Sequence, residues 1–95
     1  MSLINDIDNE MQAAKKKFPM WPDDMQHAFD IVQEEIGEAQ KDILQFHYEL
    51  DKGVTIKDIR EECVQSVCML LRFISSLDSG QYDKRPKVAH QHVQF

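Results

Sequence analysis

Acidic side chains gather on one face of a segment with helical spacing. They are Glu34, Glu35, Glu38 and Asp42. At about 100° of rotation per residue, these four positions fall within an arc of roughly 100° around a helix. The arc borders the apolar stripe of the same segment, so we expect the carboxylates to be half-buried once the helix packs against a partner.

A second acidic group occurs later in the chain and repeats this arrangement. Glu61 and Glu62 are followed one turn later by Gln65, and the three positions again lie beside an apolar stripe. If the two segments pack antiparallel, both groups face the same groove. The spacing therefore predicts a site built by two helices.

Carboxylates that lie close together raise one another's pKa unless a cation lies between them. Mg²⁺ is the cation we expect, with Mn²⁺ as a substitute, because Mg²⁺ takes oxygen ligands and completes its shell with water and phosphate. Neither segment offers a Cys or His pair that favours zinc. The alternative is a solvated acidic surface without a ligand, which costs only about 0.2 to 0.5 kcal/mol per like-charge pair.

Helix-breaking residues are few and separate three segments of helical period. The 95 residues include three Gly and three Pro. The pattern predicts helices over about 2–17, 23–51 and 55–77, and hence an all-α fold. The capping boxes that we expect are Asp23 with Gln26, and Thr55 with Asp58.

Apolar residues recur at helical spacing in all three segments. The stripes are Ile4, Ile7, Met11, Ala14 and Phe18; then Met25, Phe29, Val32, Ile36, Ala39, Ile43, Phe46 and Leu50; then Ile56, Ile59, Cys63, Val67, Leu70, Ile74 and Leu77. The two longer helices, joined by a short turn at Gly53, make an antiparallel hairpin. Two such hairpins complete a four-helix bundle, so we expect a homodimer or a homotetramer.

Charge and composition limit the class of partner. The chain has 17 acidic and 11 basic residues and a formal net charge of -6, which argues against a nucleic-acid polymer or an anionic membrane. The chain has no run of roughly 20 apolar residues and no signal-peptide pattern at its start, so we expect a cytoplasmic protein. Cys63 and Cys68 are interpreted as reduced packing residues. One domain is expected over 1–79, followed by a polar tail over 80–95.

The stretch from Trp21 to Leu77 resembles the core of the MazG-like, all-α nucleoside triphosphate pyrophosphohydrolases. Residues 34–38, EEIGE, have the form EExxE, and residues 62–65, ECVQ, stand where that superfamily has ExxD. The resemblance implies Mg²⁺-dependent hydrolysis of a surplus or non-standard nucleoside triphosphate to its monophosphate and pyrophosphate. It implies Glu35, Glu38, Glu62 and Gln65 as metal ligands, and Glu34 and Glu38 as the catalytic residues. Gln65 departs from the motif, because an amide brings no charge and cannot act as a base.

Three further side chains are candidates for contact with a nucleotide. Trp21 can stack on a base or cover the end of the bundle. His27 can reach a phosphate or base edge, or only face solvent, and Lys17 can contact phosphate or only complement the helix dipole. Two other functions stay open: a catalytically silent helical assembly or nucleotide-binding module, and a pyrophosphohydrolase that acts on phosphoribosyl-ATP.

Overall fold

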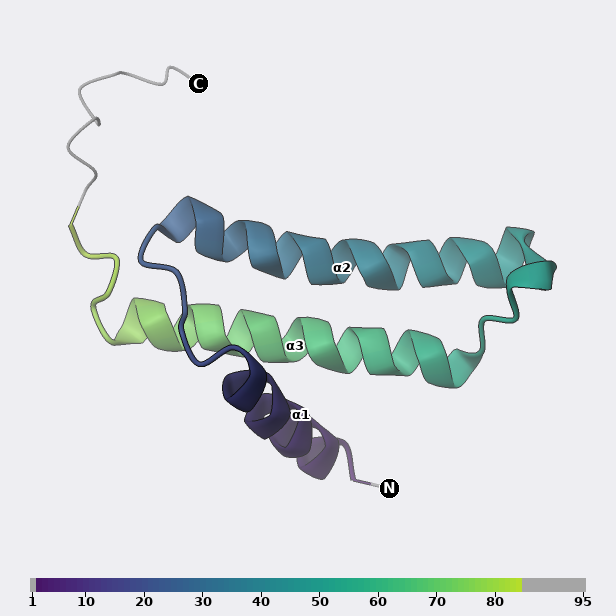
Figure 1. Ribbon diagram of the computed structural model, residues 1–95, viewed down its shortest axis with the longest axis horizontal. Helices are drawn as coiled ribbons and strands as arrows, with labels where there is room; N and C mark the ends of the chain where they lie inside the picture. The colour runs from purple at the N-terminus through teal and green to yellow at the C-terminus, as the bar shows by residue number, and fades with distance from the viewer. Residues whose placement is uncertain (1, 85–95) are drawn as a thin grey trace, which may run out of the picture.

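A computed structural model describes residues 2–84 of the chain. These residues form α1 (Leu3–Lys17), α2 (Met25–Tyr48), the short 3-10 helix η1 (Leu50–Lys52) and α3 (Ile56–Asp78), and no strand occurs among them. The prediction of an all-α fold with three helices is confirmed over this range (Figure 1). Within the same range, no helix has the length and apolarity needed to cross a membrane.

The two long helices, α2 and α3, lie side by side and antiparallel, and α1 crosses α3 at an angle (Figure 1). The connection between α2 and α3 is η1 followed by Gly53, whose φ of 68° is in the left-handed region that glycine adopts readily. Both η1 and this glycine shorten α2, which ends at Tyr48 and not at Asp51 as predicted. The predicted hairpin is therefore present with a slightly longer turn.

The predicted cap of α2 is wrong by one residue. Asp24 caps the helix, because its Oδ2 accepts a hydrogen bond of 2.9 Å from the backbone N–H of His27. The carboxylate of Asp23 is engaged elsewhere: it accepts a hydrogen bond of 3.1 Å from Gln81 Nε2. Gln26 points along its own helix and does not reach back to a capping residue. The capping box at the start of α3, in contrast, is confirmed.

Small and medium-sized side chains form the interior of the fold. The buried apolar residues are Ala14, Ala28, Val32, Ala39, Val64 and Cys68. An edge-to-face contact between Phe29 of α2 and Phe73 of α3, with ring centroids 5.2 Å apart, adds to the hairpin contact. The thiol of Cys68 donates to the carbonyl of Ile7 at 3.4 Å, which fixes α1 against α3. The interpretation of Cys68 as a packing residue is confirmed, whereas Cys63 is exposed.

The predicted apolar stripes of α2 and α3 are only partly buried. On α3, the residues that lose most of their exposed surface are Val64, Cys68, Arg72 and Ser76. These residues lie on a different face of α3 from the predicted stripe. They are buried because α1 packs against that face, where Cys68 contacts Ile7. Six large stripe residues of α2 and α3 stay between 40 and 47% exposed, and we call them the apolar face: Met25, Ile36, Val67, Leu70, Ile74 and Leu77.

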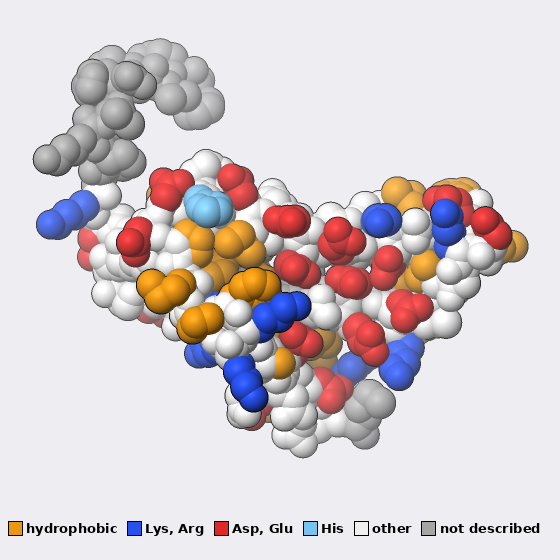
Figure 2. Space-filling model, in the orientation of Figure 1, with side chains coloured by type: hydrophobic (Ala, Val, Ile, Leu, Met, Phe, Trp, Pro, Cys, Tyr) orange, Lys and Arg blue, Asp and Glu red, His pale blue; other side chains and the backbone are white. Residues whose placement is uncertain are grey.

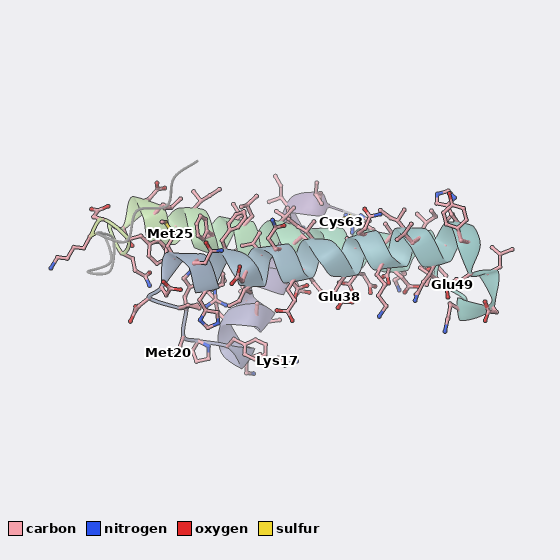
Figure 3. The ribbon with its side chains drawn as sticks, turned by 90° about the horizontal axis from the view of Figure 1, so that it is seen from above. Lys17, Met20, Met25, Glu38, Glu49 and Cys63 are labelled. Atoms are coloured by element: carbon pink, nitrogen blue, oxygen red, sulfur yellow. The ribbon has the colours of Figure 1, made fainter. Side chains whose placement is uncertain are left out.

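The apolar face and the acidic side chains lie on opposite sides of the hairpin. In Figure 3, Cys63, which belongs to the same stripe of α3, lies on the side away from Glu38, Lys17 and Met20. Large apolar side chains that stay exposed on one side of a protein are typical of a surface that associates with another molecule. The four-helix dimer itself remains a prediction.

The first residues after α3 fold back onto the start of α2. Tyr82 donates its hydroxyl to the carbonyl of Pro22 at 2.7 Å, and its ring stacks on Phe73 with centroids 5.9 Å apart. Gln81 Nε2 donates to the same carbonyl at 3.0 Å. Residues 85–95, which make up most of the predicted tail, lie outside the described residues.

Candidate functional site

Glu38 of the predicted acidic group lies on the same side of the hairpin as Lys17, the last residue of α1 (Figure 3). Glu34 and Glu38 of α2 are exposed, whereas Glu35 and Asp42 of α2 and Glu62 of α3 are half-buried. Figure 2 shows acidic side chains gathered along the middle of this face. The expectation that the carboxylates border the packed surface is met by the half-buried residues of the group.

The charges that raise the pKa of Glu35 and of Glu62 show which carboxylates lie near these two groups. The pKa of Glu35 is raised above its ordinary value of 4.5, first by burial and then by the charges of Glu34, Glu38 and Glu10. Glu34 and Glu38 belong to α2 and Glu10 belongs to α1, so two helices contribute charges that act on Glu35. Repulsion of this kind disfavours the ionised form of each member.

Glu62 of α3 is repelled by carboxylates of α2. Its pKa is raised by burial, then by the charges of Asp42, Glu35 and Glu38, and last by its neighbour Glu61. The two acidic groups that the sequence places on separate helices are therefore close enough to repel one another. We call Glu10, Glu34, Glu35, Glu38, Asp42 and Glu62 the acidic cluster.

Glu10 is a member of the cluster that sequence reasoning missed. It follows Ile7 by three residues and precedes Ala14 by four, so it lies on the face of α1 that packs. Its half-buried position and its effect on Glu35 result from the crossing of α1 over α3. The spacing of Glu10 from Ile7 and Ala14 predicts that it lies on the packed face of α1. It does not predict a carboxylate neighbour for Glu10, because that depends on where α1 packs.

The acidic cluster fits Mg²⁺ by its chemistry. Its donors are all carboxylate oxygens, which Mg²⁺ prefers, and their mutual repulsion is relieved by a divalent ion. Within residues 2–84, no three side chains of Asp, Glu, His or Cys are placed to hold one ion together. Mg²⁺ does not require such a cage, because it is commonly held by one or two carboxylates together with water and substrate phosphate.

Gln65 is turned toward α1. It lines a groove of about 720 Å³ between α1 and the first half of α3, together with Asn9 and Glu10 of α1. An ion pair between Asp6 Oδ2 and Arg60 Nη1, 2.9 Å apart, joins the two helices at this groove. Gln65 and Glu10, a member of the acidic cluster, thus line the same groove, which is large enough for a small ligand.

The three predicted nucleotide-contacting residues are not brought together. Trp21 is half-buried, with the guanidinium of Arg72 4.8 Å from its ring centroid, so one face of the indole is already covered. Lys17 is exposed with its ammonium 5.4 Å from the Phe18 ring, on the same side of the hairpin as Glu38 (Figure 3). His27 is exposed in the first turn of α2, about 10 Å along the helix from Glu34.

Comparisons with known proteins identify no relative of the chain. A scan against models of protein families gave no match, and searches among curated proteins and among solved structures gave none either. Any functional conclusion therefore rests on the residues and their arrangement.

Proposed function

We propose that this chain is a Mg²⁺-dependent nucleoside triphosphate pyrophosphohydrolase of the MazG-like, all-α type. The observation that supports this most directly is the raised pKa of Glu62 on α3, to which burial contributes most and the charges of Asp42, Glu35 and Glu38 on α2 contribute next. A site that repels its own charges is suited to a divalent cation and, through the cation, to a triphosphate. The EExxE arrangement of residues 34–38 gives the same indication.

The half-buried carboxylates are suited to hold the metal. In this proposal the ligands come from Glu35, Glu38 and Glu62, with no more than two of these carboxylates on any one ion and with water and phosphate completing its shell. Gln65 adds its amide oxygen, which can coordinate a hard cation without charge. Bound Mg²⁺ supplies neutralisation of the charge on the phosphates. The carboxylates alone would repel a triphosphate, so substrate binding is expected to depend strictly on the metal.

The exposed carboxylates of α2 are suited to act on water. Glu34 and Glu38 lie at the open rim of the acidic cluster, where a water molecule has access. A carboxylate there can orient that water and accept its proton as the water oxygen attacks the α-phosphorus. The bond to the bridging oxygen breaks, and the products are the nucleoside monophosphate and pyrophosphate.

The apolar face supports a homodimer, or a homotetramer made of two dimers. Full burial of an exposed large aliphatic side chain contributes about 1.5 to 3 kcal/mol. The side chains of the apolar face are 40 to 47% exposed, so each has somewhat less than half of that free energy to gain. The apolar face lies away from the acidic cluster (Figure 3), so this association leaves the proposed metal site accessible. The same surface and the neutral Gln65 are what a catalytically silent helical assembly would show, which makes that assembly the second candidate function.

The test is release of pyrophosphate from standard and modified nucleoside triphosphates, with Mg²⁺ and with chelator. We expect release from at least one nucleotide, and a loss of roughly 100-fold or more in Glu38→Ala, because that side chain serves both as ligand and as proton acceptor. Glu62→Gln should also be inactive. The control is Glu49→Gln, an exposed position at the end of α2, which should retain full activity.

A further variant separates the two candidate functions. Gln65→Asp supplies the charge that the ExxD pattern has at this position, and it should tighten the Mg²⁺ requirement and raise the rate. If neither the natural protein nor Gln65→Asp releases pyrophosphate from any nucleotide while both remain helical, the chain is a silent assembly.

A further inference from the structure

Arg72 of α3 is a buried cation without a counter-charge among residues 2–84. The residue is only 8% exposed. Its Nη2 donates to the carbonyl of Phe18 at 2.9 Å, and its guanidinium covers the ring of Trp21. Neither of the two ion pairs in the described part of the chain includes it. Burial lowers its pKa, as expected for a cation removed from water.

A cavity opens beside this guanidinium, between α1 and the second half of α3. Its volume is about 390 Å³, and its lining residues are Met11, Lys15, Trp21, Leu71, Arg72, Ser75 and Ser76. Every polar side chain in that lining can donate a hydrogen bond, and none is acidic. In a chain of net charge -6, two cations and two hydroxyls around one acid-free cavity form a positive site.

Trp21 supplies a further donor that lacks an acceptor. Its indole Nε1 is buried and has no hydrogen-bond partner among the described residues. Buried polar groups nearly always have a partner, so an orphaned donor in a native fold indicates something that is missing. Trp21 and Arg72 both line this cavity. The indole N–H lacks an acceptor, and the guanidinium, which donates to the carbonyl of Phe18, lacks an anionic partner among the described residues.

We propose that this cavity binds a phosphoryl group, either inorganic phosphate or the phosphate of a small monoester. A guanidinium and an ammonium match the charge of a phosphate dianion, and the guanidinium fork matches two of its oxygens. The hydroxyl of Ser75 adds a neutral donor, while Met11 and Leu71 give an apolar wall for the organic part of an ester. None of the cavity's lining residues belongs to the acidic cluster, so the proposal does not depend on the pyrophosphohydrolase activity.

The chain contains a single tryptophan, so its fluorescence reports on this cavity alone. The full chain would be titrated with inorganic phosphate and with glycerol 3-phosphate, against sodium chloride and sodium acetate at matched ionic strength. We expect a saturable change in Trp21 emission with both phosphates and none with chloride. Saturation by acetate at the same concentrations would overturn the preference for phosphate, and an unsaturable response equal to that of chloride would overturn the site.

Two variants test which residues hold the ligand. Lys15→Gln removes an exposed lining cation without touching the core, and it should weaken phosphate binding roughly two- to fivefold. Lys16→Gln removes the neighbouring charge, which does not line the cavity, and should bind as the natural protein does. Arg72→Gln should abolish the saturable response in a protein whose helicity is unchanged. Equal affinities in Lys15→Gln and Lys16→Gln would contradict the proposed site, whatever the fate of Arg72→Gln.

Discussion

At the scale of single residues, Glu35 and Glu62 make the stability of the fold depend on pH. Both have a folded-state pKa above the ordinary value of 4.5 because burial and neighbouring carboxylates disfavour their charge. The folded protein therefore binds protons more readily than the unfolded chain just above pH 4.5. Their contribution favours the folded state at and below that pH, and it is lost as pH rises through the raised pKa values.

We therefore expect the metal-free protein to become less stable between pH 4.5 and neutral pH. Urea denaturation across that window should show a falling free energy of unfolding, and the decline should be shallower in Glu62→Gln. At pH 7 that variant should be more stable than the natural protein by about 0.5 kcal/mol, the size of one like-charge contact. Mg²⁺ should restore the stability of the natural protein and have less effect on the variant.

A lower stability of Glu62→Gln at pH 7 would contradict this prediction. If Glu62→Gln were less stable than the natural protein at pH 7, the ionised carboxylate would be favourable in the metal-free fold, and the proposed repulsion would be wrong. Asp58 does not interfere in this window, because its pKa is lowered below 3.8 by hydrogen bonds to Thr55 and its effect falls at more acidic pH.

The residues of the acidic cluster and of the cavity beside Arg72 differ in how far the sequence predicts their surroundings in the fold. The approach of Glu35 to Glu62 follows from helical spacing and the short turn at Gly53, so spacing was sufficient. Glu10 and Arg72 acquire their environment from the placement of α1, which no local pattern specifies. The sequence predicts that Trp21 either stacks on a base or covers the end of the bundle, and the guanidinium of Arg72 covers one face of its ring.

At the scale of elements, the capping box of α3 begins the helix that carries Glu62. The Thr55 N–H donates to Asp58 Oδ2 at 2.8 Å, and the Asp58 N–H donates to Thr55 Oγ1 at 3.1 Å. These two bonds satisfy donors that the first turn of a helix leaves free.

Loss of this cap should lower stability without changing the site. Thr55→Ala should reduce the free energy of unfolding by about 1 kcal/mol, as other N-cap truncations do. Thermal denaturation followed by circular dichroism measures the change, and Thr55→Ser, which keeps the hydroxyl, is the matched control. Equal losses in the two variants would mean that the methyl group of Thr55, and not its hydrogen bond, stabilises the helix.

The elements also show where periodicity stops being informative. The helices form where the apolar period and the Pro and Gly breaks predict them, because those signals act within a few residues. Each long helix has apolar positions over a broad arc, however, and the sequence does not specify which part another helix covers. In α3 it is Val64 and Cys68 that α1 covers, which leaves Val67 and Leu70 facing outward.

At the scale of the whole molecule, the exposed side chains of the apolar face lead us to expect association. The natural protein should have the mass of two or of four 11.1 kDa chains in sedimentation velocity. Leu70→Glu places a charge in the apolar face and should give a particle of the single-chain mass, because burial of an unpaired charge is strongly unfavourable.

Met20→Glu is the matched control for this experiment. Met20 is 84% exposed and lies on the opposite side of the hairpin from Cys63 (Figure 3), so its replacement should leave the mass unchanged. A natural protein that already has the mass of one chain would rule out the proposed dimer.

The docking of α1 on α3 also affects the order in which the chain folds during synthesis. The hydrogen bond from Cys68 to Ile7 joins residues 61 positions apart, and α1 contacts the hairpin through α3 alone. A ribosome adds roughly 5 to 20 residues per second, so about 3 to 12 seconds separate the synthesis of α1 from that of its partner. During that interval the apolar side of α1 has no helix to pack against, and the nascent chain must stay soluble until α3 emerges.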